Sequence, residues 1–186
     1  MTAEVEMKFP VGDFGEIRIR LDQIGARLYE TRGEEDHYYS APDRDYLHTD
    51  EYLRVRCVGS KTLLTYKGPK HDAETKTRTE VEVQIAGDRE ASQQVMSLLE
   101  RLRYRTLTAV NKSRTVYIIE YDGFPIEVCL DEVSTLGTYV ELEIKADFNE
   151  IDKARSAIRS LASMLDLGPG ERRSYLELLL AAKPPS

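Results

Sequence analysis

The sequence is poor in cysteine and histidine, with two and three residues among 186. Two cysteines cannot build the disulfide framework of a small secreted domain. Cys57 and Cys129 fall inside separate predicted strands, where we expect them to be small buried hydrophobic residues. The chain therefore offers no Cys/His cluster of the kind that binds zinc.

Long apolar runs are also missing. No run approaches the roughly 20 residues of a membrane-spanning helix, and acidic residues stand at the N-terminus where a signal peptide needs its apolar region. We therefore expect a cytoplasmic protein. The 33 acidic residues outnumber the 26 basic ones, and the net charge of −7 argues against non-specific binding to nucleic acid or to an anionic membrane.

Glycine-rich phosphate-binding loops are absent as well. The chain contains neither Gly-x-x-x-x-Gly-Lys nor Gly-x-Gly-x-x-Gly. A nucleotide would therefore not be held here in the way that is usual for α/β nucleotide-binding proteins.

What the chain does contain is an alternation of strand and helix patterns that predicts an α+β fold in a single domain, residues 1–186. Asp13 and Glu16 resemble a capping box before a first helix that ends at Gly25, and Gly68-Pro69 is expected to break a strand. Further helices are predicted at about 88–102, 150–165 and 172–182. Strands are predicted at 2–9, 26–34, 36–40, 52–58, 61–67, 75–85, 103–121, 124–133 and 139–145.

The predicted strands share one unusual feature: one face of each is mostly apolar and the other is almost entirely ionic, because side chains alternate with period two. The basic set on the ionic faces is Lys8, Arg54, Arg56, Lys67, Lys76, Arg78, Lys112 and Arg114. The acidic set is Glu4, Glu6, Glu80, Glu82, Glu127, Asp131, Glu141 and Glu143.

Two architectures fit this pattern, and the residues leave both open. In an ordinary sheet, the ionic faces would be the solvent side. In a nearly closed sheet, the apolar faces would point outward under the helices, and the ionic faces would line an internal tunnel. Such a tunnel balances its charges eight against eight, which suits ion pairs and equally suits a metal-chelated polyphosphate. Carboxylates would hold the metal, Mg²⁺ or Mn²⁺ rather than zinc, and Arg and Lys would hold the phosphate oxygens.

Several short motifs resemble one known family along almost the whole chain. Glu4-x-Glu6-x-Lys8 resembles the ExExK signature of the CYTH superfamily, the triphosphate tunnel metalloenzymes. The branch most similar to this chain is the class IV adenylyl cyclases. The other motifs that carry the resemblance are Leu53-Arg54-Val55-Arg56, Tyr66-Lys67-Gly68-Pro69, Lys112-Ser113-Arg114, Leu130-Asp131, Leu136-Gly137, Glu141-x-Glu143 and Arg173-Ser174-Tyr175.

This resemblance implies a fold and a set of roles. The implied fold is an eight-stranded antiparallel β-barrel with helices packed outside. The metal set would be Glu4, Glu6, Asp131, Glu141 and Glu143, with Glu80, Glu82 and Glu127 as further tunnel acids. The triphosphate would be bound by Lys8, Arg54, Arg56, Lys67, Lys76, Arg78, Lys112 and Arg114. In catalysis itself, the expected residues are Lys8, Asp131 and Arg114.

Three functions remain open at this point. The first is an adenylyl cyclase-like reaction that converts ATP to cyclic AMP and pyrophosphate. The second is hydrolysis of inorganic, thiamine or nucleoside triphosphate, which the paired acids at 4/6, 80/82 and 141/143 favour. The third is a module that only binds polyphosphate. All three imply a small-molecule triphosphate partner, no nucleic acid and no membrane, and they leave a monomer or a homodimer open.

Overall fold

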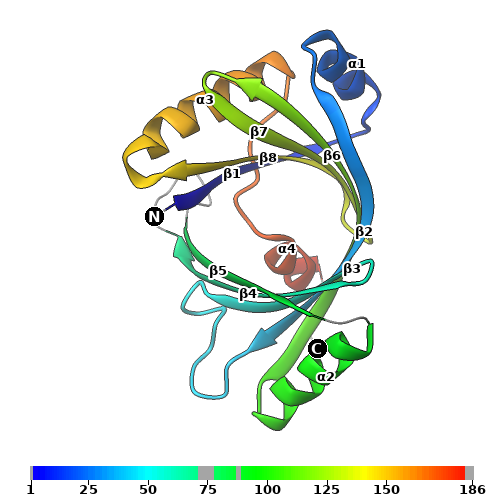
Figure 1. Ribbon diagram of the computed structural model, residues 1–186, viewed down its shortest axis with the longest axis vertical. Helices are drawn as coiled ribbons and strands as arrows, with labels where there is room; N and C mark the ends of the chain where they lie inside the picture. The colour runs from blue at the N-terminus through cyan, green and yellow to red at the C-terminus, as the bar shows by residue number, and fades with distance from the viewer. Residues whose placement is uncertain (1, 71–77, 87–88, 183–186) are drawn as a thin grey trace.

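Eight antiparallel strands close into a barrel in the computed structural model, which describes residues 2–70, 78–86 and 89–182 (Figure 1). Around the barrel the strands follow the order β1-β5-β4-β3-β2-β6-β7-β8. The strands are β1 Thr2–Val11, β2 Arg27–Ser40, β3 Tyr52–Val58, β4 Lys61–Lys70, β5 Arg78–Ile85, β6 Arg105–Tyr121, β7 Phe124–Val133 and β8 Gly137–Asp147. The helices are α1 Gly15–Gln23, α2 Arg89–Arg101, α3 Ile151–Met164 and α4 Tyr175–Ala182, and a short 3₁₀ turn, η1 Phe148–Glu150, precedes α3.

Strands β2 and β4 correct two sequence predictions. Residues 26–34 and 36–40 form one strand, β2, because its pairing with β6 continues without a break from Glu30↔Val116 to Tyr38↔Thr108. Gly68-Pro69 does not end β4 either. A register shift between Lys67 and Lys70 in the pairing with β5 accommodates these two residues, in line with the preference of proline for bulges.

The first helix also begins differently from the prediction. Its N-cap is Phe14, with no side-chain hydrogen bond to the cap. Asp13 accepts a hydrogen bond from the Gly15 amide at 2.7 Å, so its carboxylate closes a local turn instead of forming a capping box with Glu16.

The main hydrophobic core lies outside the barrel wall, beneath α3. Helix α3 crosses β1, β7 and β8 (Figure 1), and its Ile158 and Leu161 are fully buried in one cluster with Val5, Val128 and Leu142 of those strands. The apolar strand faces therefore point outward and the ionic faces inward. The tunnel architecture is confirmed, and the ordinary sheet is excluded.

Helices α4 and α2 bury two smaller clusters. Tyr175 and Leu176 of α4 pack against residues of β2, β6 and β7, and α4 is seen through the ring of strands in Figure 1. Leu99 of α2 packs with Val55 of β3. The cover on this side is incomplete, because Val81 on the outer face of β5 is 55% exposed.

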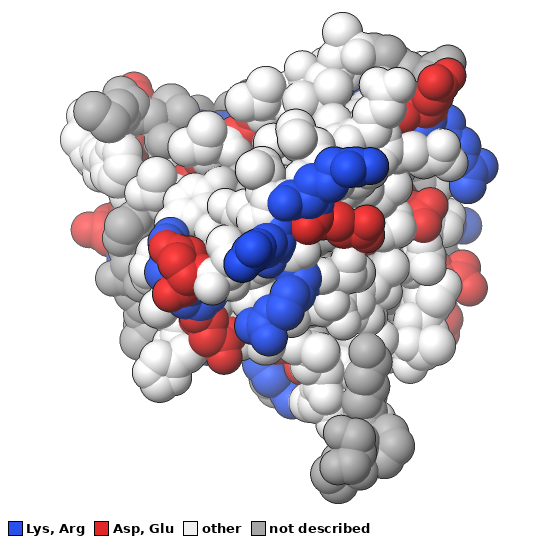
Figure 2. Space-filling view, turned by 90° about the horizontal axis from the view of Figure 1, so that it is seen from below, with Lys and Arg blue, Asp and Glu red and all other residues white. Residues whose placement is uncertain are grey.

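Charges of both signs are interspersed on the face that Figure 2 shows, where basic side chains lie beside acidic ones. Elsewhere on the surface, Arg20 and Asp166 form an ion pair at 3.0 Å. Among the described residues, no helix combines the length and the apolar character needed to cross a membrane.

The packing of α3 generates a stability prediction. Replacing Leu161, which is fully buried, by alanine should lower the free energy of unfolding by about 2–5 kcal/mol, because the contacts of the side chain are lost and a cavity remains. Leu98 of α2 is 56% exposed, so Leu98→Ala should change the free energy of unfolding by less than about 0.5 kcal/mol. Urea unfolding monitored by circular dichroism measures both. Equal losses in the two variants would contradict this assignment of the core.

Candidate functional site

The ionic strand faces line one internal cavity of about 510 Å³. Four strands each contribute a residue of the predicted ionic faces to the wall of this cavity: Arg54, Glu80, Lys112 and Glu141. The complete set of predicted site residues on its wall is Glu4, Glu6, Arg54, Arg56, Lys67, Arg78, Glu80, Glu82, Lys112, Arg114, Glu127, Glu141 and Glu143. Lys76 lies outside the described residues, whereas Lys8 and Asp131 are fully buried on the inward faces of β1 and β7 and do not border the cavity.

Strand pairing places the acidic side chains together. Glu6 of β1 lies opposite Glu143 of β8, and Glu143 in turn lies opposite Glu127 of β7. Glu4 precedes Glu6 by two residues and Glu141 precedes Glu143 by two, so each pair shares the inward face. Carboxylates from three adjacent strands therefore form one acidic wall.

The acidic wall carries more negative charge than its cations neutralise. Burial raises the pKa of Glu143, Arg114 lowers it, and the carboxylates of Glu4, Glu141 and Glu6 raise it again, to a final value of about 8. A carboxyl group with this pKa marks a place where an added cation would be stabilised. All-oxygen ligands of this kind fit Mg²⁺ or Mn²⁺.

On the opposite side of the barrel, two arginines of β3 face Asp36 of β2. Arg56 donates two hydrogen bonds to the Asp36 carboxylate, at 2.7 and 2.8 Å. Burial of Asp36 raises its pKa, but Arg56 and Arg54 more than offset this and bring the pKa to about 2. Asp36 is therefore an anion that holds these arginines in position.

Arg54 is bound more loosely than Arg56. Its Nη1 lies 3.5 Å from Asp36 and its Nη2 lies 3.4 Å from the Thr65 hydroxyl. Its Nε is buried and has no hydrogen-bond partner among the described residues. Because a buried N–H without a partner is unfavourable, Arg54 has donor capacity left for an anion in the cavity.

Arg114 is held by acids on several sides. It donates to the two Asp131 carboxylate oxygens at 2.7 and 2.6 Å, to Glu143 at 3.1 Å, and also to Glu141. Asp131, which is fully buried, also accepts from Tyr175 at 2.9 Å and from Lys112 at 3.1 Å. Asp131 thus fixes two tunnel cations from a fully buried position on the inward face of β7.

The two tunnel lysines nearest the N-terminal strand have different surroundings. Lys67 forms ion pairs with Glu4 at 2.8 Å and with Glu80 at 2.9 Å, so it bridges β1 and β5. Lys8 donates to the Arg173 carbonyl at 2.5 Å and lies 3.9 Å from the centre of the Tyr175 ring. In this arrangement Lys8 links β1 to the segment that precedes α4.

The sequence prediction missed several charged residues of the tunnel. Arg32 and Asp36 of β2 and Lys145 of β8 border the cavity. Glu34 is 3% exposed, and although burial raises the pKa of its carboxyl, Lys112, Arg56 and Arg114 hold that pKa well below the usual range. The alternation of residues 32, 34 and 36 could have placed them on one strand face. Because two separate strands were predicted, ending at 34 and beginning at 36, this alternation was not recognised.

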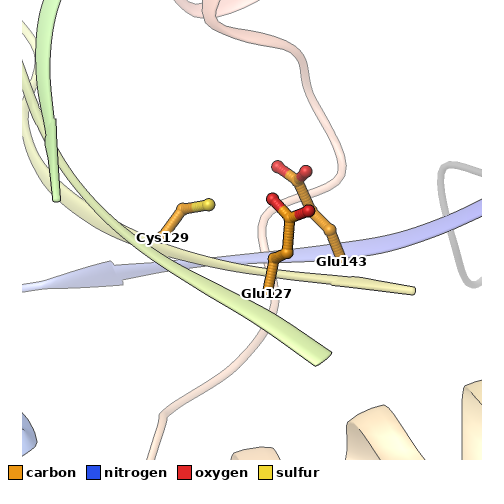
Figure 3. Close-up of side chains that lie close together, drawn as sticks. All are labelled: Glu127, Cys129 and Glu143. Atoms are coloured by element: carbon orange, nitrogen blue, oxygen red, sulfur yellow. The ribbon is translucent and has the colours of Figure 1, made fainter. Parts of the chain in front are cut away.

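The cysteines also depart from the prediction. Cys57 is only partly buried. Cys129 is fully buried, yet its thiol lies on the tunnel side of β7, and its sulfur and carboxylate oxygens of Glu127 and Glu143 all lie within 4.8 Å of one another (Figure 3). The structure therefore contains a cysteine among potential metal ligands, which the sequence did not lead us to expect.

Comparison with known proteins indicates the family to which this chain belongs. The sequence profile of the CYTH domain matches residues 2–175. A protein of Methanocaldococcus jannaschii, named as a candidate adenylate cyclase, is 35% identical over 178 residues, which are 94% of this chain and 97% of that protein. The structure of the PH1819 protein from Pyrococcus horikoshii is 37% identical, with a TM-score of 0.86 over 97% of this chain and 99% of the other.

A more distant structure shares the fold. It is a Hippeastrum protein that is named as a candidate adenylyl cyclase and described as having a dominant triphosphatase activity. It is 17% identical, with a TM-score of 0.70 over 99% of this chain and 97% of that protein. At this identity the likeness concerns the barrel alone. The family profile over nearly the whole chain, the two relatives above 30% identity and the closed, charged barrel lead to one conclusion: this chain belongs to the CYTH domain family.

Proposed function

We propose that this protein is a divalent-metal-dependent enzyme that converts ATP, bound through its triphosphate in the tunnel, to cyclic AMP and pyrophosphate. The observation that carries the proposal is one cavity with a wall of carboxylates from β1, β7 and β8 and cations from β3, β4 and β6. A metal-chelated triphosphate presents the complementary charges to both walls.

On the basic side, the proposed ligands of the phosphate oxygens are Arg54, Arg56, Lys67, Arg78, Lys112 and Arg114. Arg54 is the best placed of these, because its Nε has no partner among the described residues and its remaining contacts are long. Arg56 and Arg114 are fixed by Asp36 and Asp131. Cations held in this way need little reorganisation when the phosphate charge changes during the reaction.

On the acidic side, Glu4, Glu6, Glu141 and Glu143 would hold Mg²⁺ or Mn²⁺. Their oxygen donors fit these cations, and burial together with the carboxylates of Glu4, Glu141 and Glu6 raises the pKa of Glu143. When bound, such a cation supplies charge neutralisation on the phosphates and activation of the attacking oxygen. The protein residues orient the triphosphate between this wall and the arginines.

In the proposed reaction, the 3′-hydroxyl oxygen of ATP forms a bond to the α-phosphorus. The bond from that phosphorus to the bridging α–β oxygen breaks, pyrophosphate leaves, and the hydroxyl proton passes to solvent. The name of the relative that is 35% identical supports this choice of reaction.

Triphosphate hydrolysis is the second candidate, because it uses the same cavity with water as the nucleophile. The Glu-x-Glu pairs at 4/6, 80/82 and 141/143 all reach the cavity, and they provide more acids than a single metal ion requires. The activity described for the Hippeastrum fold neighbour is of this type. A module that only binds polyphosphate is the third candidate and has the least support.

The experiment that separates these functions compares two substrates. The full-length protein is incubated with ATP or with inorganic triphosphate, in the presence of Mg²⁺ or Mn²⁺, and cyclic AMP, pyrophosphate and orthophosphate are separated. The cyclase proposal predicts equal amounts of cyclic AMP and pyrophosphate from ATP. Orthophosphate from both substrates without cyclic AMP would establish the triphosphatase instead, and no turnover with measurable binding would establish the binding module.

The acidic wall predicts strict metal dependence. Glu6→Gln removes one ligand charge at nearly constant volume, so it should reduce turnover by at least a hundredfold while circular dichroism and the thermal midpoint stay close to wild type. Glu132 of β7 is exposed, and Glu132→Gln should retain full activity. Excess chelator should abolish turnover of the wild-type protein. Full activity in chelator would exclude the proposed role of the carboxylates.

The basic wall predicts an effect on every substrate that carries the triphosphate. Charged hydrogen bonds contribute about 1.5–3 kcal/mol each, so Arg54→Ala should lower kcat/KM by about ten- to a hundredfold. Arg54→Lys keeps the charge but loses the planar fork, and it should be impaired less but still clearly. The surface variant Arg20→Ala serves as control. An unchanged kcat/KM for Arg54→Ala, with whichever triphosphate is turned over best, would remove Arg54 from the binding site.

A further inference from the structure

Three potential metal ligands converge on the tunnel side of β7 and β8. Glu127 and Cys129 are two residues apart on β7, so they share the inward face, and Glu127 is paired directly with Glu143 of β8. The Cys129 sulfur and one carboxylate oxygen from each glutamate lie within 4.8 Å of one another. Figure 3 shows both carboxylates and the thiol directed toward a common space.

The Cys129 thiol has no hydrogen-bond partner among the described residues, and the charged group next to it is the Arg114 guanidinium. Cys129 is completely buried, and within the described parts of the chain no hydrogen bond to its sulfur is found. Glu127 likewise forms no ion pair or hydrogen bond with described residues, whereas Glu143 is contacted by Arg114 at 3.1 Å. A buried side chain that points into the tunnel instead of into the outer core, and bonds to nothing there, requires an explanation.

We propose that Glu127, Cys129 and Glu143 form a binding site for a thiophilic divalent cation such as Zn²⁺ or Co²⁺. Three protein ligands of this kind leave the fourth tetrahedral position open toward the cavity, which Glu127 and Glu143 also line. Tetrahedral zinc places sulfur and oxygen ligands about 3.3–3.8 Å apart. Atoms that are already within 4.8 Å therefore reach this geometry through small side-chain adjustments.

The sulfur ligand distinguishes this site from the all-carboxylate wall. Magnesium binds hard oxygen ligands, whereas a thiolate selects softer metals. The inference depends on the position of the thiol and not on which reaction the tunnel performs.

Titration of the full-length, metal-free protein with Co²⁺ tests the site without any turnover. Thiolate coordinated to Co²⁺ absorbs in the near ultraviolet by charge transfer, and carboxylate ligands do not. The band should appear in the wild type and in Cys57→Ser, which removes the other cysteine of the chain. It should be absent in Cys129→Ser.

A second variant keeps the test decisive if Cys129→Ser does not fold, which circular dichroism would reveal. Glu127 lies at the partly exposed rim of the site, so Glu127→Gln should fold normally and weaken Co²⁺ binding at least tenfold, measured by the same band. The inference would be overturned by no band in the wild type, by a band that persists in Cys129→Ser and disappears in Cys57→Ser, or by unchanged affinity in Glu127→Gln.

Discussion

The compensation of buried charge is the constraint on which the rest of this structure depends. A closed barrel turns ionic strand faces inward, and an unpaired charge in such an interior is very unfavourable. In this structure, ion pairs between neighbouring strands, such as Arg56 with Asp36 and Lys67 with Glu80, provide the compensation. These pairs add to the strand pairing in holding the barrel closed, and they fix long side chains that would otherwise be mobile.

The compensation of buried charge is incomplete at Arg54 and at Glu143, and both residues line the cavity. The Nε of Arg54 has no partner among the described residues, and burial together with the neighbouring carboxylates raises the pKa of Glu143 to about 8. One wall therefore has unused hydrogen-bond donors and the other has unused negative charge. A ligand that carries phosphate oxygens and a divalent cation satisfies both at once, which is the physical basis of the proposed function.

Asp131, a buried residue that does not border the cavity, organises cations that do. Asp131 accepts hydrogen bonds from Arg114, Lys112 and Tyr175, and Tyr175 also packs beneath Lys8. Because Tyr175 begins α4, the docking of this helix is coupled to the positions of two tunnel cations. The C-terminal segment thus belongs to the architecture of the site as well as to that of the core.

The sequence by itself determined which side chains share a strand face, because alternation is a local property of the backbone. It predicted the bounds of Tyr52–Val58 and Phe124–Val133 as the structure has them, and through family resemblance it indicated the barrel and most of the residues that line the cavity. From the residues alone, however, the inward or outward direction of the ionic face stayed open. Only the tertiary structure decided it, since it depends on the packing of α3 against β1, β7 and β8 and on closure between β1 and β5. Other non-local contacts carried β2 through Glu35 by its pairing with β6, buried Asp131 on the inward face of β7 and brought the thiol of Cys129 to Glu127 and Glu143, because register between distant strands is not encoded in local spacing.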